Sequence, residues 1–347
     1  MKLTFAQLQQ ITLGAAWLEN REDGIRFCRF TPEQETVYRD YDIDLYHNAM
    51  SSTEVRLSFR TDSPWLELEG YFLRPSQSTR GVLDVKVNGT FVAMVSSPDD
   101  EGQRETAEGE RPDQLEGKAA DFNRSRFAQR VELGKGMKEV QIYLSWCKPT
   151  VLQRLEVADG SVLQPIRPDR NLLVFGDSLT QGHYVERNFQ GWVNKLADAL
   201  NAEVCSKGVG GEVHFPALAR CKDVLAPDYI VVGYGTNDWS RTTKETFRKN
   251  VPDFYEALKT NYPHAKIVTL LPMWNPQEDE VRKWGVLEEL RRELAEIAGG
   301  FPNVSVVNCY DFNSRLPEHR SVGCHPNAEG YAIYADNLIP AIKMCFE

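Results

Sequence analysis

The 347-residue sequence lacks several features that mark specialised classes of protein. No apolar run approaches the roughly 20 residues that span a bilayer. The first ten residues hold neither a long apolar stretch nor a small-residue cleavage site. No basic cluster stands out in a chain whose formal net charge is −10. We therefore expect no membrane span, no secretory signal and no nucleic-acid partner.

The cysteines also lack the spacing of a disulfide framework or a zinc site. There are seven, an odd number, and no two of them form a C-x-x-C pair. Scattered thiols of this kind are usually small core residues. Together with the missing signal, they predict a protein of the reducing cytoplasm.

Short strands are predicted in the first half of the chain, where apolar and polar residues alternate in whole or in part. The candidate strands are residues 55–59, 66–72, 83–87, 91–95 and 139–146. Asn88-Gly89, between two of them, predicts a type I′ hairpin turn. Many short antiparallel strands are typical of a β-sandwich or a jelly roll.

An acidic stretch from Asp99 to Glu116 interrupts this pattern. It holds eight acidic and two basic residues, so its net charge of −6 is more than half of the total of −10. A stretch of this composition is typical of a solvated loop. The alternative is a lid over a neighbouring site, because long loops are often functional.

The second half alternates buried strands with helices, which is typical of a parallel sheet covered on both faces. The candidate strands are residues 171–176, 229–235, 266–272 and 304–310, and the clearest helices span residues 277–298 and 328–345. Two prolines near residues 164–168 mark a boundary. We predict a β-sandwich domain over residues 1–165 and an α/β domain over residues 166–347.

Ligands of parallel α/β sheets bind at the carboxyl ends of the strands, so the residues that follow each strand are the candidates for chemistry. Ser178, in Gly-Asp-Ser-Leu-Thr-Gln-Gly, follows the first strand, on a predicted turn into a helix N-terminus that could stabilise an oxyanion. Thr180 excludes the G-x-S-x-G elbow of α/β-hydrolases. The alternative for the serine is a helix cap.

A second strand, between residues 176 and 208, is followed by Gly208-Val-Gly-Gly-Glu212. The next residue, Val213, stands where a dinucleotide-binding fingerprint needs glycine. We expect a glycine-rich turn whose N–H faces a developing negative charge, or else a plain tight turn. Asn237 follows the third strand, where its amide could serve an oxyanion or close an Asx turn. His325, just before the last helix, could reach the serine or be an ordinary packed histidine.

Taken together, these four elements resemble the GDSL or SGNH hydrolases over about residues 170–347. The resemblance implies a flavodoxin-like three-layer fold and ester hydrolysis. It implies Ser178 as nucleophile and His325 as base, with an oxyanion hole from the Ser178 N–H, the Gly211 N–H and the Asn237 amide. In this resemblance Gly208 is the less favoured occupant of the glycine position.

The sequence departs from this family at one position. The family motif D-x-x-H has an aspartate that orients the histidine, and here Val322 takes its place. In the serine protease template, a wrong tautomer lowers the rate roughly 10⁴-fold. A backbone carbonyl could orient His325, Asp311 or Glu318 could supply the acid, or most of the activity could be lost. Cys324 beside the histidine is taken as incidental.

The first half also resembles, more loosely, the jelly-roll-like domain of two-domain acetyl esterases of carbohydrate esterase family two. Asp42-Ile-Asp-Leu-Tyr46 is similar to a G-x-D-L-Y segment of related bacterial proteins but lacks its glycine. We predict a serine esterase for short acyl esters, acetyl on a sugar or oligosaccharide foremost, with no metal or organic cofactor.

Three alternatives stay open at this point. Trp274 and Asn275 either wall the acyl or sugar pocket or form a structural turn before Pro276. An acyltransferase would use the same acyl-enzyme. A carbohydrate-binding protein with a vestigial site would retain the four signature residues without turnover.

Overall fold

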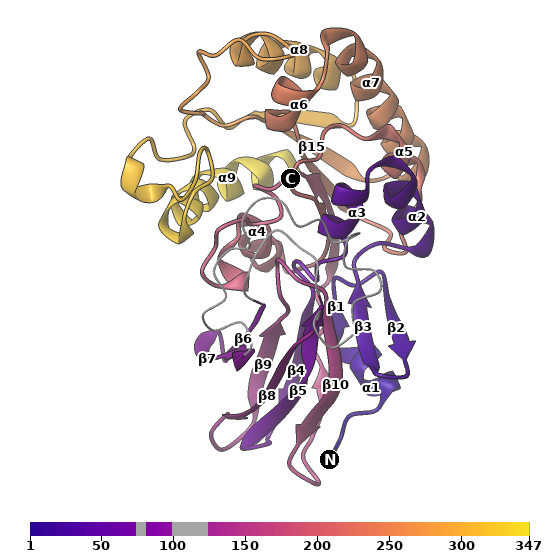
Figure 1. Cartoon of the computed structure of the whole chain (residues 1–347), viewed down its shortest axis with the longest axis vertical. Coiled ribbons are helices and arrows are strands. Elements are labelled where there is room, and N and C mark those ends of the chain that lie inside the picture. Colours follow the sequence, from indigo (N-terminus) through magenta and orange to yellow (C-terminus); the bar gives the residue numbers. More distant parts are fainter. Residues whose placement is uncertain (74–80, 99–123, 347) are drawn as a thin grey trace. The chain divides into compact units, whose positions relative to one another are not determined.

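The computed structural model describes residues 1–73, 81–98 and 124–346 (Figure 1). Its contacts divide the chain into two compact units, Met1–Phe30 with Met50–Arg167 and Thr31–Ala49 with Pro168–Glu347. The second unit thus includes Thr31–Ala49, a segment that a single boundary at residue 165 leaves in the first domain. The acidic stretch Asp99–Glu116 lies outside the described residues.

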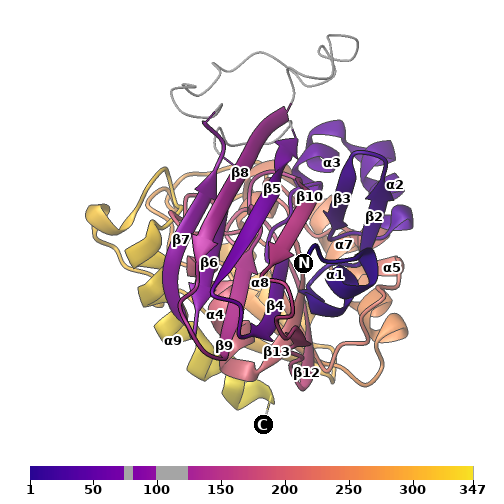
Figure 2. The same ribbon diagram turned by 90° about the horizontal axis from the view of Figure 1, so that it is seen from below.

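The first unit is built from antiparallel sheets (Figure 2). One sheet has the order β1-β4-β9-β6-β7, with β11 paired to β4, and the other has the order β2-β3-β10-β5-β8. The strands of the first sheet are β1 (Thr12–Leu13), β4 (Arg56–Thr61), β6 (Val82–Val87), β7 (Thr90–Ser96), β9 (Lys138–Tyr143) and β11 (Gln164–Pro165). Those of the second are β2 (Trp17–Arg21), β3 (Gly24–Cys28), β5 (Trp65–Leu73), β8 (Arg124–Glu132) and β10 (Thr150–Val157), and helix α1 (Phe5–Ile11) precedes them all.

Apolar side chains of the two sheets form one buried core, so this unit is a β-sandwich. Phe59 and Val140 of the first sheet are buried in the same cluster as Leu68 and Leu155 of the second. The predicted alternating strands therefore each coincide with an observed strand, within a few residues at the ends. Asn88 has φ 48° and Gly89 has φ 79°, as a type I′ turn between β6 and β7 requires.

The second unit contains a parallel sheet of order β13-β12-β14-β15-β16. Its strands are β12 (Arg170–Gly176), β13 (Ala202–Gly208), β14 (Tyr229–Gly233), β15 (Lys266–Leu271) and β16 (Val304–Asn308). In chain order this is 2-1-3-4-5, the order of flavodoxin-like folds. The predicted α/β architecture is thus confirmed.

Helices cover both faces of this sheet (Figure 1). On one side α4 (Trp192–Leu200) packs against α9 (Ala328–Phe346), and on the other α7 (Lys244–Asn261) packs between α5 (Pro216–Arg220) and α8 (Leu287–Gly299). Short helix α6 (Thr236–Arg241) follows β14, and two 3₁₀ turns, η4 (Asn188–Gln190) and η5 (Pro317–His319), lie in loops. Within the described ranges, no helix is long and apolar enough to cross a bilayer.

The helix predicted over residues 277–298 begins ten residues later than expected. Val281, on the predicted apolar face, is 77% exposed. Trp284 is buried, but it lies in a tight turn in which Arg282 and Gly285 exchange two backbone hydrogen bonds. Gly285, which ends this turn, has a φ of 132°. The apolar spacing here therefore belongs to a loop followed by a helix, and α8 begins at Leu287.

Two helices from the first fifty residues belong to the second unit. Helix α2 (Pro32–Tyr41) begins with a capping box from Thr31 and packs beside α5, and α3 (Ile43–Ala49) follows directly. The Asp42 carboxylate accepts hydrogen bonds from the backbone N–H groups at the start of α3, as a helix cap does. The segment Asp42–Tyr46, which resembles G-x-D-L-Y, is therefore the junction of this helical pair.

Candidate active site

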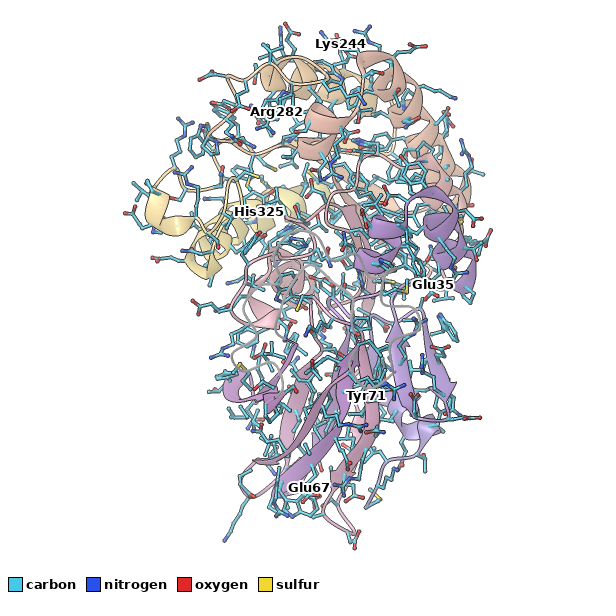
Figure 3. The ribbon with its side chains drawn as sticks, viewed as in Figure 1. Glu35, Glu67, Tyr71, Lys244, Arg282 and His325 are labelled. Atoms are coloured by element: carbon cyan, nitrogen blue, oxygen red, sulfur yellow. The ribbon has the colours of Figure 1, made fainter. Side chains whose placement is uncertain are left out.

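The parallel sheet brings three of the predicted residues to the carboxyl ends of adjacent strands. Ser178 follows β12, Gly211 follows β13 and Asn237 follows β14, and these strands are neighbours in the sheet. Figure 3 labels His325, which lies in the loop that leads into α9. Ser178 itself opens a run of turns over residues 178–184, and α4 begins only at Trp192. The expectation that it lies at a helix N-terminus is therefore wrong.

The serine and the histidine are in direct hydrogen-bond contact. Ser178 Oγ lies 2.8 Å from His325 Nε2. On the far side of the ring, His325 Nδ1 lies 3.0 Å from the backbone oxygen of Val322. A carbonyl oxygen can only accept a hydrogen bond, so Nδ1 carries the proton and Nε2 is free to accept from the serine hydroxyl.

A tight turn places the carbonyl that holds the histidine. The Val322 oxygen also accepts the backbone N–H of His325, and Gly323 between them has φ 59°, a conformation that glycine adopts at little cost. The Ser321 N–H donates to the His325 oxygen and closes the hairpin. Replacing the family's aspartate with Val322 therefore leaves a hydrogen-bond acceptor at Nδ1, taken from the main chain.

Neither of the two acids considered as substitutes forms a hydrogen bond with the His325 ring in the described part of the chain. The Asp311 carboxylate is 79% exposed and pairs with Arg315 at 2.8 Å. Glu318 accepts from Asn327 through its backbone oxygen. In the described part of the chain, the hydrogen bonds of the His325 ring are those to Ser178 and Val322. Of the arrangements weighed from the sequence, this geometry fits the backbone-carbonyl dyad.

Burial sets the charge state of the histidine. It lowers the pKa of His325 below the ordinary value, and the hydrogen bond to Val322 offsets only part of this effect. The imidazole is therefore neutral at neutral pH and can act as a base. The neighbouring His183, whose ring stacks on that of His325 at 5.8 Å between centroids, has its pKa lowered to about 3, mainly by burial.

Two backbone N–H groups of the predicted oxyanion hole have no acceptor in the described part of the chain. Within the described ranges, neither the Ser178 N–H nor the Gly211 N–H donates to another group. Gly211 has φ 89°, which an L residue rarely adopts. The Asn237 amide donates one hydrogen to the Glu212 oxygen at 3.1 Å, and an amide nitrogen has a second to donate. Gly208, by contrast, ends β13 and its N–H approaches Ser206 Oγ.

The glycine turn is braced from both sides. The Gly210 N–H donates to Gln181 Oε1 at 2.7 Å, and the Gly210 oxygen accepts from Asn48 of α3 at 3.1 Å. The buried Glu212 carboxylate accepts from Tyr38 of α2 at 2.6 Å and from Tyr234 at 2.7 Å. These contacts fix the peptides on either side of Gly211, so its N–H direction is preset before any substrate binds.

Several of these residues were not anticipated from the sequence. Gln181 Oε1 also accepts from His183 Nε2 at 3.1 Å, so one amide links the glycine turn to the histidine pair. Tyr184 contacts the His325 ring edge-on at 5.1 Å and is held at φ 68°. The only signal available was their proximity to Ser178 in the chain.

Burial favours the neutral form of two ionisable groups beside the dyad. Burial raises the pKa of Asp177 to about 7, although its carboxylate accepts the Leu179 N–H. Burial likewise raises the pKa of the Cys324 thiol to about 11. A thiol of this kind is a poor nucleophile, which agrees with the incidental role expected for it.

The residues that follow β15 form a turn. The Asn275 side-chain oxygen accepts the Gln277 N–H at 2.9 Å, and its backbone oxygen accepts the Glu278 N–H. The guanidinium groups of Arg315 and Arg320 lie 5.7 and 5.3 Å from the centre of the Trp274 ring. These contacts agree with the structural alternative for this pair.

Comparisons with known proteins cover the part of the chain that holds these residues. The model of the GDSL-like lipase/acylhydrolase family matches residues 174–333, which include all four predicted site residues. No curated protein sequence matches the chain significantly.

Solved structures similar to the chain cover both of its units. A salicylyl-acyltransferase, SsfX3, from a tetracycline biosynthetic pathway is 20% identical, covers 96% of this chain and 94% of its own, and has a TM-score of 0.76. A family two carbohydrate esterase from Clostridium thermocellum is 14% identical over 96% and 99% of the chains, with a TM-score of 0.64. One from Cellvibrio japonicus is 18% identical over 96% and 94%, with a TM-score of 0.62. At these identities the structures establish a shared fold, and residues 174–333 of the chain form a GDSL-like lipase/acylhydrolase domain.

Proposed function

We propose that the protein is a serine esterase that hydrolyses short acyl esters, with an acetyl group on a carbohydrate as the foremost substrate. The observation that carries this proposal is the dyad, in which Ser178 Oγ lies 2.8 Å from a histidine nitrogen whose tautomer a carbonyl fixes. The family two carbohydrate esterases that share this fold favour an acylated sugar as the alcohol component.

In the proposed first step, Ser178 Oγ attacks the ester carbonyl carbon while its proton passes to His325 Nε2. The carbonyl oxygen becomes an oxyanion and accepts hydrogen bonds from the Ser178 and Gly211 N–H groups and the free hydrogen of the Asn237 amide. When the intermediate collapses, the C–O bond to the alcohol breaks and the departing oxygen takes the proton from Nε2. The product is an acyl-serine.

In the second step the same groups act on water. His325 Nε2, again neutral, removes a proton from water as the water oxygen attacks the acyl carbon. The intermediate expels Ser178 Oγ, which recovers its proton, and the carboxylic acid leaves. Throughout, Nδ1–H continues to donate to Val322, so the carbonyl dipole faces the transient imidazolium and supports its charge.

Hydrolysis of p-nitrophenyl acetate and of acetylated xylo-oligosaccharides tests this proposal. We expect Ser178→Ala to lower kcat/KM at least 10³-fold, while Ser161→Ala in the sandwich keeps it unchanged. Because the His325 pKa is lowered, kcat/KM should stay level at neutral pH and fall in acid with a midpoint below about 6.5. Turnover that persists in Ser178→Ala, or its absence from the wild type on every ester, would contradict the proposal.

Acyl transfer to an alcohol is the second candidate, and the salicylyl-acyltransferase of the same fold favours it. The acyl-serine is common to both reactions, so only its acceptor differs. A vestigial binding protein is disfavoured because the dyad and the free N–H groups are in place. Product analysis in water with added glycerol or cellobiose separates the two: a new ester as the main product supports transfer, and free acid supports hydrolysis.

A further inference from the structure

Helix α6 presents two side chains to the glycine turn. Asn237 and Arg241 are four residues apart in Thr236–Arg241, so they lie on the same face of the helix, one above the other. The Asn237 amide contacts the Glu212 oxygen, next to Gly211. Asp238, the next residue along, is buried in a hydrogen bond with His214. The exposed face of α6 therefore carries Arg241 beside a proposed oxyanion donor.

The Arg241 guanidinium rests flat against Gly211. A Cβ atom on this glycine would lie 2.9 Å from Nη1 and 3.3 Å from both Cζ and Nη2 of Arg241. Three atoms of the planar group are thus nearly equidistant from one point, which means that a face of the guanidinium covers the glycine. Any side chain at this position would displace it, so the absence of one lets Arg241 reach the turn.

Arg241 lacks the anionic partner that several exposed arginines of the same unit have. Arg248 pairs with Glu293 at 2.7 Å, and Arg220 pairs with Asp253 at 3.6 Å. Arg241 is exposed, and within the described ranges it takes part in no hydrogen bond or ion pair. Its charge acts on Asp177, but that carboxyl is 1% exposed and burial opposes its ionisation. The donors of the guanidinium are therefore available to a ligand.

We propose that Arg241 binds a carboxylate carried by the substrate. The inference rests on the esterase function proposed above, because a substrate whose carbonyl sits at the Gly211 N–H lies against this guanidinium. Arginine presents its N–H donors in a rigid fork that matches the two oxygens of a carboxylate. The substrate is thus an ester with a carboxylate in its acyl group, as in a succinyl ester, or in its alcohol, as in an acetylated sugar acid.

Two matched substrate pairs distinguish these sources. Mono-p-nitrophenyl succinate against p-nitrophenyl butyrate varies the acyl group, and acetylated glucuronate against acetylated glucose varies the alcohol. We expect the wild type to prefer the charged member of one pair at least tenfold in kcat/KM, since a charge-assisted hydrogen bond contributes about that much. Arg241→Gln should reduce this ratio to about one, and Arg220→Gln should leave it as in the wild type.

The proposal is overturned if Arg241→Gln leaves the charged-to-uncharged kcat/KM ratio unchanged in both substrate pairs. This includes the case in which the variant slows both substrates of a pair equally. Calorimetry with Ser178→Ala tests binding apart from turnover, with free succinate and glucuronate as ligands. One of them should bind Ser178→Ala at least tenfold more tightly than the Ser178→Ala/Arg241→Gln double variant. Equal binding, or none, overturns the proposal even if the esterase activity is confirmed, and binding that depends on Arg241 supports it even if hydrolysis fails.

Discussion

Two histidines of the second unit have opposite surroundings. His214 Nδ1 lies 3.1 Å from the Asp238 carboxylate, both side chains are almost fully buried, and Nε2 has no hydrogen-bond partner in the described structure. Four aromatic rings surround it, those of Tyr234, Phe247, Phe254 and Tyr255. His325 has a serine at Nε2 and only a main-chain oxygen at Nδ1.

Under the proposed function, an acid partner does not by itself make a histidine catalytic. His214 has the aspartate of a triad but no nucleophile and no path for a substrate, because aromatic rings fill the space around it. His325 lacks the aspartate, yet it contacts Ser178, the proposed nucleophile. What the dyad needs from the partner of Nδ1 is the correct tautomer, and a carbonyl supplies it.

The largest expected effect comes from replacing each of these histidines, in turn, with glutamine. His325→Gln removes the base, so kcat should fall by roughly 10³ to 10⁴-fold while the urea midpoint stays within error. His214→Gln leaves the buried Asp238 poorly paired, so the free energy of unfolding should fall by about 2 kcal/mol. The folded fraction of that variant, counted by active-site titration, should keep kcat within a few-fold of the wild type. A collapse of kcat in folded His214→Gln would show that the Asp238 pair serves the reaction.

Asp177 provides the next test, because it is the acid beside the serine and burial raises its pKa to about 7. Between about pH 4 and pH 7 the folded state then binds more protons than the unfolded state, so the free energy of unfolding falls as pH rises. Asp177→Asn removes this contribution and keeps an oxygen for the Leu179 N–H. We expect the wild type to lose on the order of 3 kcal/mol more than this variant between pH 4 and pH 8. Urea unfolding of both proteins across this range measures the difference, and parallel curves would exclude a raised pKa.

A smaller effect is expected at the brace of the glycine turn. Tyr38→Phe removes the hydrogen bond from the Tyr38 hydroxyl to the buried Glu212 carboxylate, which loosens the turn that holds Gly211. Losing an oxyanion donor outright lowers kcat 10² to 10³-fold, so a loosened donor should lower kcat roughly tenfold with KM unchanged. Thr36→Ala, on the exposed side of the same helix, is the matched control. Each rate is divided by the burst amplitude of p-nitrophenol, so that unfolded protein does not count. If the corrected kcat of Tyr38→Phe equals that of the wild type, Tyr38 does not support the glycine turn during the reaction.

These contacts also show what a sequence can predict. The positions of Ser178 and Asn237 follow from a rule, since residues after parallel strands gather at one edge of the sheet. The contact of Asn48 with the glycine turn could not be predicted in this way. Its partner Gly210 is 162 residues away, and no local pattern links a helix in the first fifty residues to the second unit. The Val322 carbonyl was considered but could not be selected, because every residue has one and only the turn at Gly323 aims it at the ring.

The smallest expected effect restores the family's aspartate, with Val322→Asp. The Val322 side chain is 55% exposed, so a carboxylate fits there, and it would compete with the carbonyl for the Nδ1 proton. Because the tautomer is already set, kcat/KM at neutral pH should change less than about threefold. A nearby anion raises a histidine pKa, so the acid limb of the pH profile should move to higher pH, whereas Val322→Asn should leave it in place. A tenfold or larger gain in kcat from Val322→Asp would mean that the carbonyl orients His325 poorly. An acid at Nδ1 would then contribute more to the rate than the tautomer alone.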